Sequence, residues 1–186
     1  MPTLRDIRTR IGSVKSTQKI TSAMKMVSAS KFKRYQDKMT TLRHFQTNLQ
    51  KVLNETLTPE ADNKLLAEKE VKKVHLCVIT SDRGLCGSFN NNIIKNANKL
   101  KQTLESEGKA VYFSFLGKKG NDFFKRRNEN IDKFFEFEKD KTELEMLKEV
   151  YGFLLNGFLE ERWDEVVIVF SRFKSVMSQT ADCLRL

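Results

Sequence analysis

The chain has 186 residues, of which 39% are apolar and 31% charged, and its formal net charge is +10. This size and balance predict one sizeable folded core with an appendage, and no stretch approaches a transmembrane span or the apolar core of a signal peptide. The three cysteines, Cys77, Cys86 and Cys183, are odd in number and lack metal-ligand spacing, which favours reduced thiols in a cytoplasmic-type compartment.

One very long helix is expected at the amino terminus. Between Gly12 and Pro59 the chain runs for 46 residues without glycine or proline, and its apolar residues recur three and four apart. Thr3 and Asp6 resemble a capping box and Thr58-Pro59 is a stop signal, so the helix is predicted from Leu4 to Leu57. Its apolar seam, which Gln46 interrupts, consists of Leu4, Ile7, Ile11, Val14, Ile20, Met24, Val27, Phe32, Tyr35, Met39, Leu42, Leu49 and Leu53.

Such a helix would be longer than the domain that carries it. At about 1.5 Å per residue it would extend about 80 Å, whereas a compact globule of this chain length has a diameter of about 40 Å. We therefore expect the helix to protrude and to lay its seam on a second helix, and no later segment of the chain is long enough to serve.

The positive charge is concentrated on this helix. Residues 1–57 contain twelve Lys or Arg and three Asp or Glu, so nine of the ten surplus charges lie there. A basic helix with an apolar seam predicts an acidic or anionic surround, which leaves nucleic acid, lipid headgroups and an acidic protein channel open. A mitochondrial presequence over residues 5–35 is disfavoured because the heptads continue to Leu53.

The pattern changes after a polar linker. We predict domains at residues 1–58 (coiled-coil stalk), 59–73 (linker) and 74–186 (globular α/β), with strands separated by helices and hence a small Rossmann-like domain with a mostly parallel sheet. The strands are predicted at Val74–Thr80, Ala110–Leu116, Ile131–Phe137 and Glu165–Phe170, and the helices at Phe89–Glu107, Asp122–Arg127 and Thr142–Arg162. The inner face predicted for the last helix is Leu144, Leu147, Val150, Tyr151, Leu154, Leu155 and Phe158.

Few residues of this domain are candidates for a catalytic, metal-binding or phosphate-binding site. Gly117 and Gly120 are interpreted as turn residues at a helix entry, since no phosphate-binding motif accompanies them. His44 and His75 lack partner ligands at suitable spacing, so neither is predicted to be a metal ligand or a catalytic base. No catalytic, metal or cofactor site is expected.

The segment from Thr80 to Asn92, TSDRGLCGSFNNN, is the main candidate site. It follows a strand at the sheet edge where open α/β domains bind ligands, Gly84 and Gly87 free its backbone, and Ser88 or Asn90 is a candidate helix cap. Three interpretations remain: an anion site at a helix start, a reactive Cys86 beside Arg83, or a rigid contact loop. The contact loop is favoured because no histidine lies near Cys86.

Two blocks, LRDIRTRIGSVKSTQKITSAMKMVSASK and SDRGLCGSFN, together closely resemble the gamma subunit of the F-type ATP synthase. The similarity runs over the whole chain, including a late SRFKSVMSQ segment that looks like the family's last strands. The resemblance implies a noncatalytic rotor subunit, without cofactor, that turns inside a ring of alpha and beta subunits and so couples proton translocation to ATP synthesis or hydrolysis. Lys19, Lys25 and Lys31 would face acidic loops of the catalytic subunits.

The resemblance also implies two contact sets and a location. Its partners would be the alpha and beta subunits, the epsilon subunit and the membrane c-ring, and its place the cytoplasmic face of a bacterial plasma membrane or an organelle inner membrane. The expected ring contacts are Gln18, Lys19, Ile20, Thr21, Ala23, Met24, Lys25, Met26, Val27 and Lys31. The expected contacts of the foot, near epsilon and the c-ring, are Arg83, Gly84, Leu85, Cys86 and Gly87.

The family's carboxy-terminal helix, which pairs with the first helix in a left-handed coiled coil, has no counterpart before Leu186. We therefore expect this chain alone to make an incomplete shaft. Two other functions stay open: a basic coiled-coil protein that binds nucleic acid, although no recognition motif or stacking platform is present, and a small enzyme using Cys86.

Overall fold

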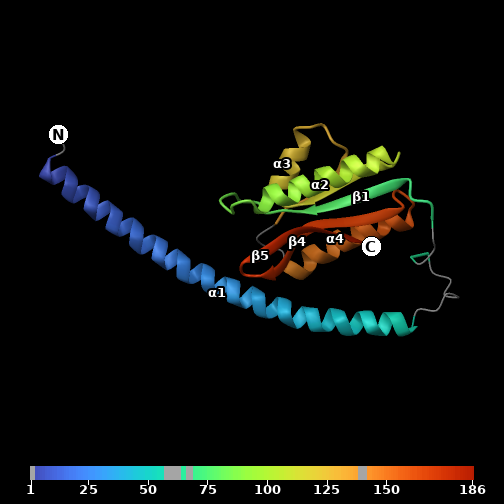
Figure 1. Cartoon of the computed structure of the whole chain (residues 1–186), viewed down its shortest axis with the longest axis horizontal. Coiled ribbons are helices and arrows are strands. Elements are labelled where there is room, and N and C mark those ends of the chain that lie inside the picture. Colours follow the sequence, from blue (N-terminus) through green and yellow to red (C-terminus); the bar gives the residue numbers. More distant parts are fainter. Residues whose placement is uncertain (1–2, 57–63, 66–68, 138–141) are drawn as a thin grey trace. The chain divides into compact units, whose positions relative to one another are not determined.

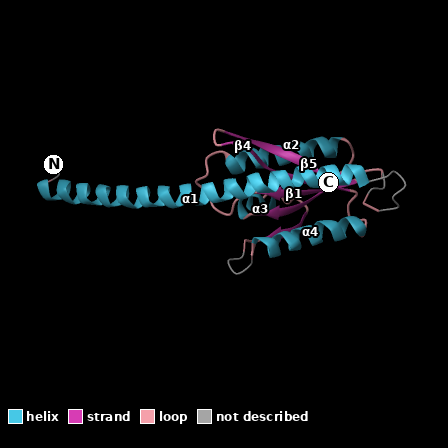
Figure 2. Ribbon diagram, turned by 90° about the horizontal axis from the view of Figure 1, so that it is seen from below, coloured by secondary structure: helices cyan, strands magenta, loops and turns pink. Residues whose placement is uncertain are grey.

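The computed structural model describes residues 3–56, 64–65, 69–137 and 142–186 (Figure 1). The chain divides into two compact units, Met1–Ala61 and Asp62–Leu186. In the first unit, helix α1 (Leu4–Thr56) is continuous over 53 residues (Figure 2), which confirms the long helix. Leu57, the last residue predicted in it, and the stop signal Thr58-Pro59 lie outside the described residues.

The start of α1 is fixed by the predicted capping box. The backbone N–H and the hydroxyl of Thr3 both donate to Asp6 Oδ2, at 2.9 and 2.7 Å, and the Asp6 N–H donates back to Thr3 Oγ1 at 3.3 Å. These hydrogen bonds lower the pKa of Asp6, because they favour its ionised form. A carboxylate in the first turn also faces the positive end of the helix dipole.

The second unit is a five-stranded sheet covered by helices. Its elements are β1 (Lys73–Ile79), α2 (Phe89–Ser106), β2 (Ala110–Leu116), α3 (Lys118–Lys125), β3 (Ile131–Phe135), α4 (Glu143–Leu159), β4 (Glu165–Ser175) and β5 (Ser178–Arg185). The strand order is β3-β2-β1-β4-β5, with β5 antiparallel to β4 and all other neighbours parallel. The prediction of an α/β domain with a mostly parallel sheet is confirmed.

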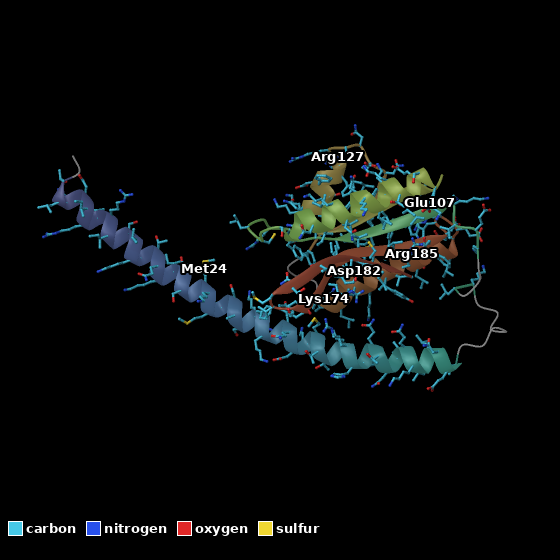
Figure 3. The ribbon with its side chains drawn as sticks, viewed as in Figure 1. Met24, Glu107, Arg127, Lys174, Asp182 and Arg185 are labelled. Atoms are coloured by element: carbon cyan, nitrogen blue, oxygen red, sulfur yellow. The ribbon has the colours of Figure 1, made fainter. Side chains whose placement is uncertain are left out.

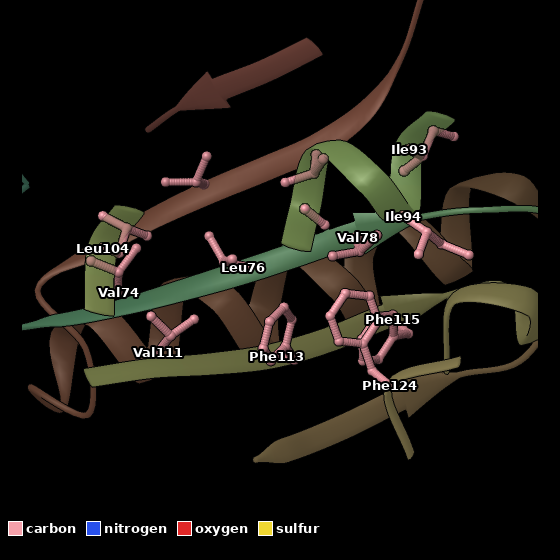
Figure 4. Close-up of a cluster of buried hydrophobic side chains, with 13 residues drawn as sticks. Val74, Leu76, Val78, Ile93, Ile94, Leu104, Val111, Phe113, Phe115 and Phe124 are labelled. Carbon is pink, nitrogen blue, oxygen red and sulfur yellow. The ribbon is translucent and has the colours of Figure 1, made fainter. Parts of the chain in front are cut away.

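Two cores lie on opposite faces of this sheet. On β1 alternate side chains point to opposite faces, so Val74, Leu76 and Val78 join the core beneath α2 and α3, whereas Cys77 joins the core beneath α4. Figure 4 shows the first core, in which the phenyl rings of β2 and α3 meet the aliphatic side chains of β1 and α2. A strand buried on both faces explains why β1 is apolar from Val74 to Ile79 apart from His75.

The second core is closed by the only tryptophan of the sequence. Trp163 is 2% exposed, its indole Nε1 donates to the Leu154 carbonyl at 3.2 Å, and its ring lies 4.1 Å from that of His75. Gly157 of α4 packs directly against the indole, since a Cβ at this position would lie 1.8 Å from Trp163 Cζ2. Glycine at 157 is therefore a packing requirement.

The predicted inner face of α4 is partly wrong. Leu144, Leu147 and Tyr151 are 60%, 59% and 64% exposed, while the buried residues of α4 are Met146, Val150, Leu154 and Gly157. Apolar residues occur around most of this helix, so the sequence allowed more than one buried stripe. The fit of Gly157 against Trp163 selects the orientation that the structure shows.

Three other elements differ from the sequence prediction. Strand β4 continues to Ser175, five residues beyond the predicted end at Phe170. Helix α3 begins at Lys118, four residues before the predicted start, so that Gly120 lies within the helix and is not a turn residue. Strand β5 was not predicted from periodicity, because it is an edge strand with no fully buried residue and so lacks an apolar pattern. It is defined by its pairing with β4, from Val167↔Arg185 to Ser175↔Ser178.

Candidate functional site

The seam of α1 is an exposed apolar surface. No residue of α1 is buried, and every seam residue except Met39 is between 42% and 78% exposed. Burying an aliphatic side chain of this size contributes about 1.5 kcal/mol or more. A helix that covered the seam would therefore gain a large apolar contact, and a seam this long is typical of coiled-coil packing.

The residues predicted to contact the ring do not share one face of α1. Ile20, Met24, Val27 and Lys31 follow one another at spacings of four, three and four, so Lys31 continues the line of the seam. At 3.6 residues per turn Ala23 lies nearest that line, whereas Lys19 and Lys25 lie away from it and the remaining members, Gln18, Thr21 and Met26, occupy the rest of the circumference. All ten side chains are exposed. The set is thus suited to a partner that surrounds the helix.

The segment from residue 12 to residue 30 has a feature that the sequence reasoning missed. Ten of its nineteen residues are Gly, Ala, Ser or Thr, whereas aromatic residues begin at Phe32. Small side chains make this part of the helix slim, because the approach distance of a packed element depends on side-chain size. A count of small residues along the heptads would have revealed it.

The candidate loop of the second unit is anchored at Thr80, which is buried. Its N–H donates to the Leu116 carbonyl at 2.8 Å, its hydroxyl donates to the Gly117 carbonyl at 3.1 Å, and the Gly120 N–H donates to the same hydroxyl oxygen at 2.9 Å. The two glycines permit this contact, because a Cβ at Gly117 would lie 2.1 Å from the Thr80 carbonyl oxygen. The end of β1 is thereby tied to the start of α3.

A side-chain network holds the middle of the loop. Asn90 Oδ1 accepts from the Ser81 N–H at 3.0 Å, and Asn90 Nδ2 donates to Ser81 Oγ at 2.9 Å and to Cys86 Sγ at 3.1 Å. Ser88 is the N-cap residue of α2, as predicted, but its side chain makes no cap hydrogen bond. Asn90 does not cap the helix, because its amide is used to hold the loop.

The tip of the loop exposes an apolar side chain on a strained backbone. Leu85 is 111% exposed and has φ +60°, a left-handed conformation that costs a residue with a Cβ about 1 kcal/mol or more. Gly87 has the same φ without that cost. Arg83, Gly84 and Cys86 are also exposed. A strained, exposed leucine on a rigid support favours the contact-loop interpretation.

Comparison with known proteins decides the family. A family model described as "ATP synthase" matches residues 3–186. The chain is 40% identical to the ATP synthase gamma chain of Bdellovibrio bacteriovorus and 42% identical to that of Chlorobium phaeobacteroides, with 99% and 96% of this chain covered. The chain belongs to the ATP synthase gamma-chain family.

Solved structures agree with this family fold. A central stalk and c-ring structure of the Tetrahymena thermophila mitochondrial ATP synthase matches 90% of this chain and 71% of its own, with a TM-score of 0.68 at 24% identity. A Euglena gracilis mitochondrial ATP synthase structure matches 98% of this chain and 56% of its own, with a TM-score of 0.52 at 20% identity. The chain spans about three fifths of the length of its curated gamma-chain relatives, 64% and 62% for the two named above.

One buried polar cluster of this gamma-family domain has the residue types of a hydrolase triad. His75 Nε2 lies 2.8 Å from Ser114 Oγ, and His75 Nδ1 lies 3.3 Å from Asp132 Oδ2. His75 and Ser114 are fully buried, and the pKa of His75 is lowered to about 3, mainly by burial and secondarily by Arg162. A neutral histidine that no substrate can reach is a structural group.

The thiols of the domain are not paired with one another. Cys77, Cys86 and Cys183 are free cysteines, and burial raises the pKa of the Cys77 thiol to about 11. The pKa of Cys183 is raised as well, again chiefly by burial. Among the described residues no group of three or more His, Cys, Asp or Glu could hold a metal ion. No helix in the described part of the chain is long and apolar enough to cross a membrane.

Proposed function

We propose that this chain is the central-stalk rotor subunit of a proton-translocating F-type ATP synthase. The observation that carries the proposal is α1, a 53-residue helix with an exposed seam and a slim, basic amino-terminal half, in a member of the gamma-chain family. The chain would contribute no catalytic group. It would couple rotation of the membrane c-ring to the ring of alpha and beta subunits, because each rotational angle of an asymmetric shaft favours different conformations of the surrounding subunits.

We propose that the motif from Gln18 to Val27, together with Lys31, contacts the alpha and beta subunits. Lys19 and Lys25 have no carboxylate partner within the described residues and lie outside the seam, which leaves both ammonium groups available to acidic loops. Such contacts are screened by salt, so their contribution to the affinity would decrease as the ionic strength rises.

The loop from Arg83 to Gly87 is proposed as a contact of the foot with the epsilon subunit or the c-ring. Its support is the exposed, strained Leu85 on a backbone fixed by Thr80 and Asn90. The chain would then be held at the membrane through these partners, on the cytoplasmic face of a bacterial plasma membrane or at an organelle inner membrane.

The test is association with a ring of alpha and beta subunits. We expect the full chain to co-elute with the ring in gel filtration, and the double variant Lys19→Glu, Lys25→Glu to bind about tenfold more weakly because two attractions become repulsions. Lys51→Glu is the control, since it reverses the charge of one lysine, half the change of the double variant, at an exposed position of α1 outside the motif. Failure of the unsubstituted chain to bind, or equal losses in both variants, would refute the proposed ring contact.

A DNA-binding titration separates the alternative function. Neutralisation of many phosphates by α1 would give tight binding at physiological ionic strength with a steep salt dependence. The rotor proposal predicts only weak binding that disappears at about 150 mM salt. Tight, salt-steep binding together with no association with the ring would favour the nucleic-acid function.

A further inference from the structure

A cation-lined cavity lies beside the candidate loop. Its volume is about 540 Å³, within the range of small-ligand sites, and its walls come from the loop, the start of α2, α3 and the turn that follows α3. Lys119, Arg126 and Arg127 line it, with Asp122 as the single carboxylate among the lining residues. The lining therefore carries a net charge of two positive units at neutral pH.

Within the described part of the chain, the three cations of the lining have no internal counter-ion, unlike two paired lysines on neighbouring elements of the same unit. Lys101 lies 2.6 Å from a Glu129 oxygen and Lys133 lies 3.0 Å from a Glu149 oxygen. No carboxylate of the described residues lies within salt-bridge distance of Lys119, Arg126 or Arg127. Like charges that converge on one concave surface repel one another, and a bound anion would relieve that repulsion.

The cavity is built on a fixed backbone. The Lys119 N–H donates to the Ser81 carbonyl at 3.1 Å, and the Lys118 N–H donates to Asp82 Oδ1 at 2.9 Å, so two hydrogen bonds join the loop to the start of α3. Gly84 does not obstruct the Lys119 side chain, because even a Cβ at this position would lie 3.9 Å from Lys119 Cε. The site requires little rearrangement to accept a ligand.

One guanidinium is held in place before any ligand arrives. Arg127 stacks on the Phe123 ring with its Cζ 3.6 Å from the centroid, and its Nη1 donates to the Phe123 carbonyl at 3.4 Å. Figure 3 shows Arg127 in the turn that follows α3. A stacked guanidinium has lost part of its rotamer freedom, so less entropy is lost when it binds an anion.

We propose that this cavity binds a phosphate-bearing anion, with Lys119, Arg126 and Arg127 as its ligands. Guanidinium groups bind phosphate oxygens in a bidentate manner and lysine adds a point charge, which is the donor set that the lining supplies. The phosphate belongs either to a small solute, such as inorganic phosphate or pyrophosphate, or to the headgroup of an anionic lipid. This inference does not depend on the proposed rotor function.

The test is a titration of the full chain with inorganic phosphate and with pyrophosphate, followed by the backbone amide NMR signals. We expect saturable shifts of Gly84, Gly87 and Asn91 that are confined to the cavity. The variant Lys119→Gln, Arg126→Gln should bind about tenfold more weakly or worse. The matched control is Lys125→Gln, which removes an exposed charge from α3 that does not line the cavity, and it should stay within about threefold of the unsubstituted chain.

A vesicle-binding experiment distinguishes the two sources of phosphate, a small solute and a lipid headgroup. Vesicles of phosphatidylglycerol and of phosphatidylcholine are sedimented with each variant. Loss of phosphatidylglycerol binding in the double variant alone assigns the site to a lipid headgroup, whereas saturable phosphate binding without vesicle binding assigns it to a solute. Shifts spread over the whole basic surface, equal losses in Lys125→Gln and the double variant, or no saturable binding of either kind would overturn the proposal.

Discussion

Alanine substitution at the two glycines of α4 separates helix propensity from packing. Both Gly152 and Gly157 lie inside the helix, where alanine is favoured over glycine by about 0.5–1 kcal/mol. A Cβ at Gly152 would meet nothing within 4 Å. Gly152→Ala should therefore raise the free energy of unfolding by that amount, and it serves as the control for the second position.

Gly157→Ala carries the same propensity gain but a steric cost. The new Cβ would lie 1.8 Å from Trp163 Cζ2 and 2.2 Å from Cη2, whereas carbon atoms in contact are about 3.5–4.0 Å apart. The indole must shift, which costs about 1–3 kcal/mol in overpacking. The shift would also break the buried hydrogen bond to Leu154, at a further cost of about 1–3 kcal/mol. We expect Gly157→Ala to be about 3 kcal/mol less stable than Gly152→Ala.

Urea unfolding followed by tryptophan fluorescence measures both variants, because Trp163 is the sole tryptophan and its indole is the group displaced. Equal midpoints for the two variants with unchanged slopes would refute the packing argument. So would a stabilised Gly157→Ala variant with a blue-shifted emission, since that would mean that the indole accommodates the methyl group without exposure.

Two further predictions concern a buried and an exposed position. Because burial lowers the pKa of His75 to about 3 from 6.5, the unfolded state binds the extra proton between these values, and stability falls as pH falls. Lowering the pH from 7.5 to 5.5 should cost about 1.4 kcal/mol in the unsubstituted chain and in the control His44→Gln, measured by urea unfolding; the same loss in His75→Gln would contradict this assignment. At the loop tip, Leu85→Gly removes a left-handed leucine that buries nothing, so the melting temperature should rise by the equivalent of about 0.5–1 kcal/mol. A decrease in that temperature would show that Leu85 makes a stabilising contact.

The sequence contains nearly all the information on local structure that this fold uses. The absence of glycine and proline between Gly12 and Pro59, with apolar residues three and four apart, sufficed for α1, because helix formation depends on neighbours along the chain. The capping box of Thr3 and Asp6 was predicted in the same way, from residues three positions apart. Both ends of β2 were predicted to the residue, since a strand buried on both faces is apolar at nearly every position, here at all except Ser114.

Contacts between segments that are distant in the sequence could not be predicted from the sequence in this way. The sequence offered several apolar stripes on α4, and only the approach of Trp163 to Gly157 chose among them. Thr80 gave no sign that it would hold Gly117 and Gly120, which lie 37 and 40 positions further along the chain. The pairing of β5 depends on the position of β4, so no local pattern marked it.

The sequence by itself therefore determined that this protein has a long, basic, seamed helix and a parallel α/β domain, because period, charge and turn signals are properties of neighbouring residues. The tertiary structure alone decided which face of α4 is buried, how the loop after β1 is held, and which cations gather around one cavity. Those features arise where segments remote in sequence meet, and packing at close range, rather than residue type, selects them.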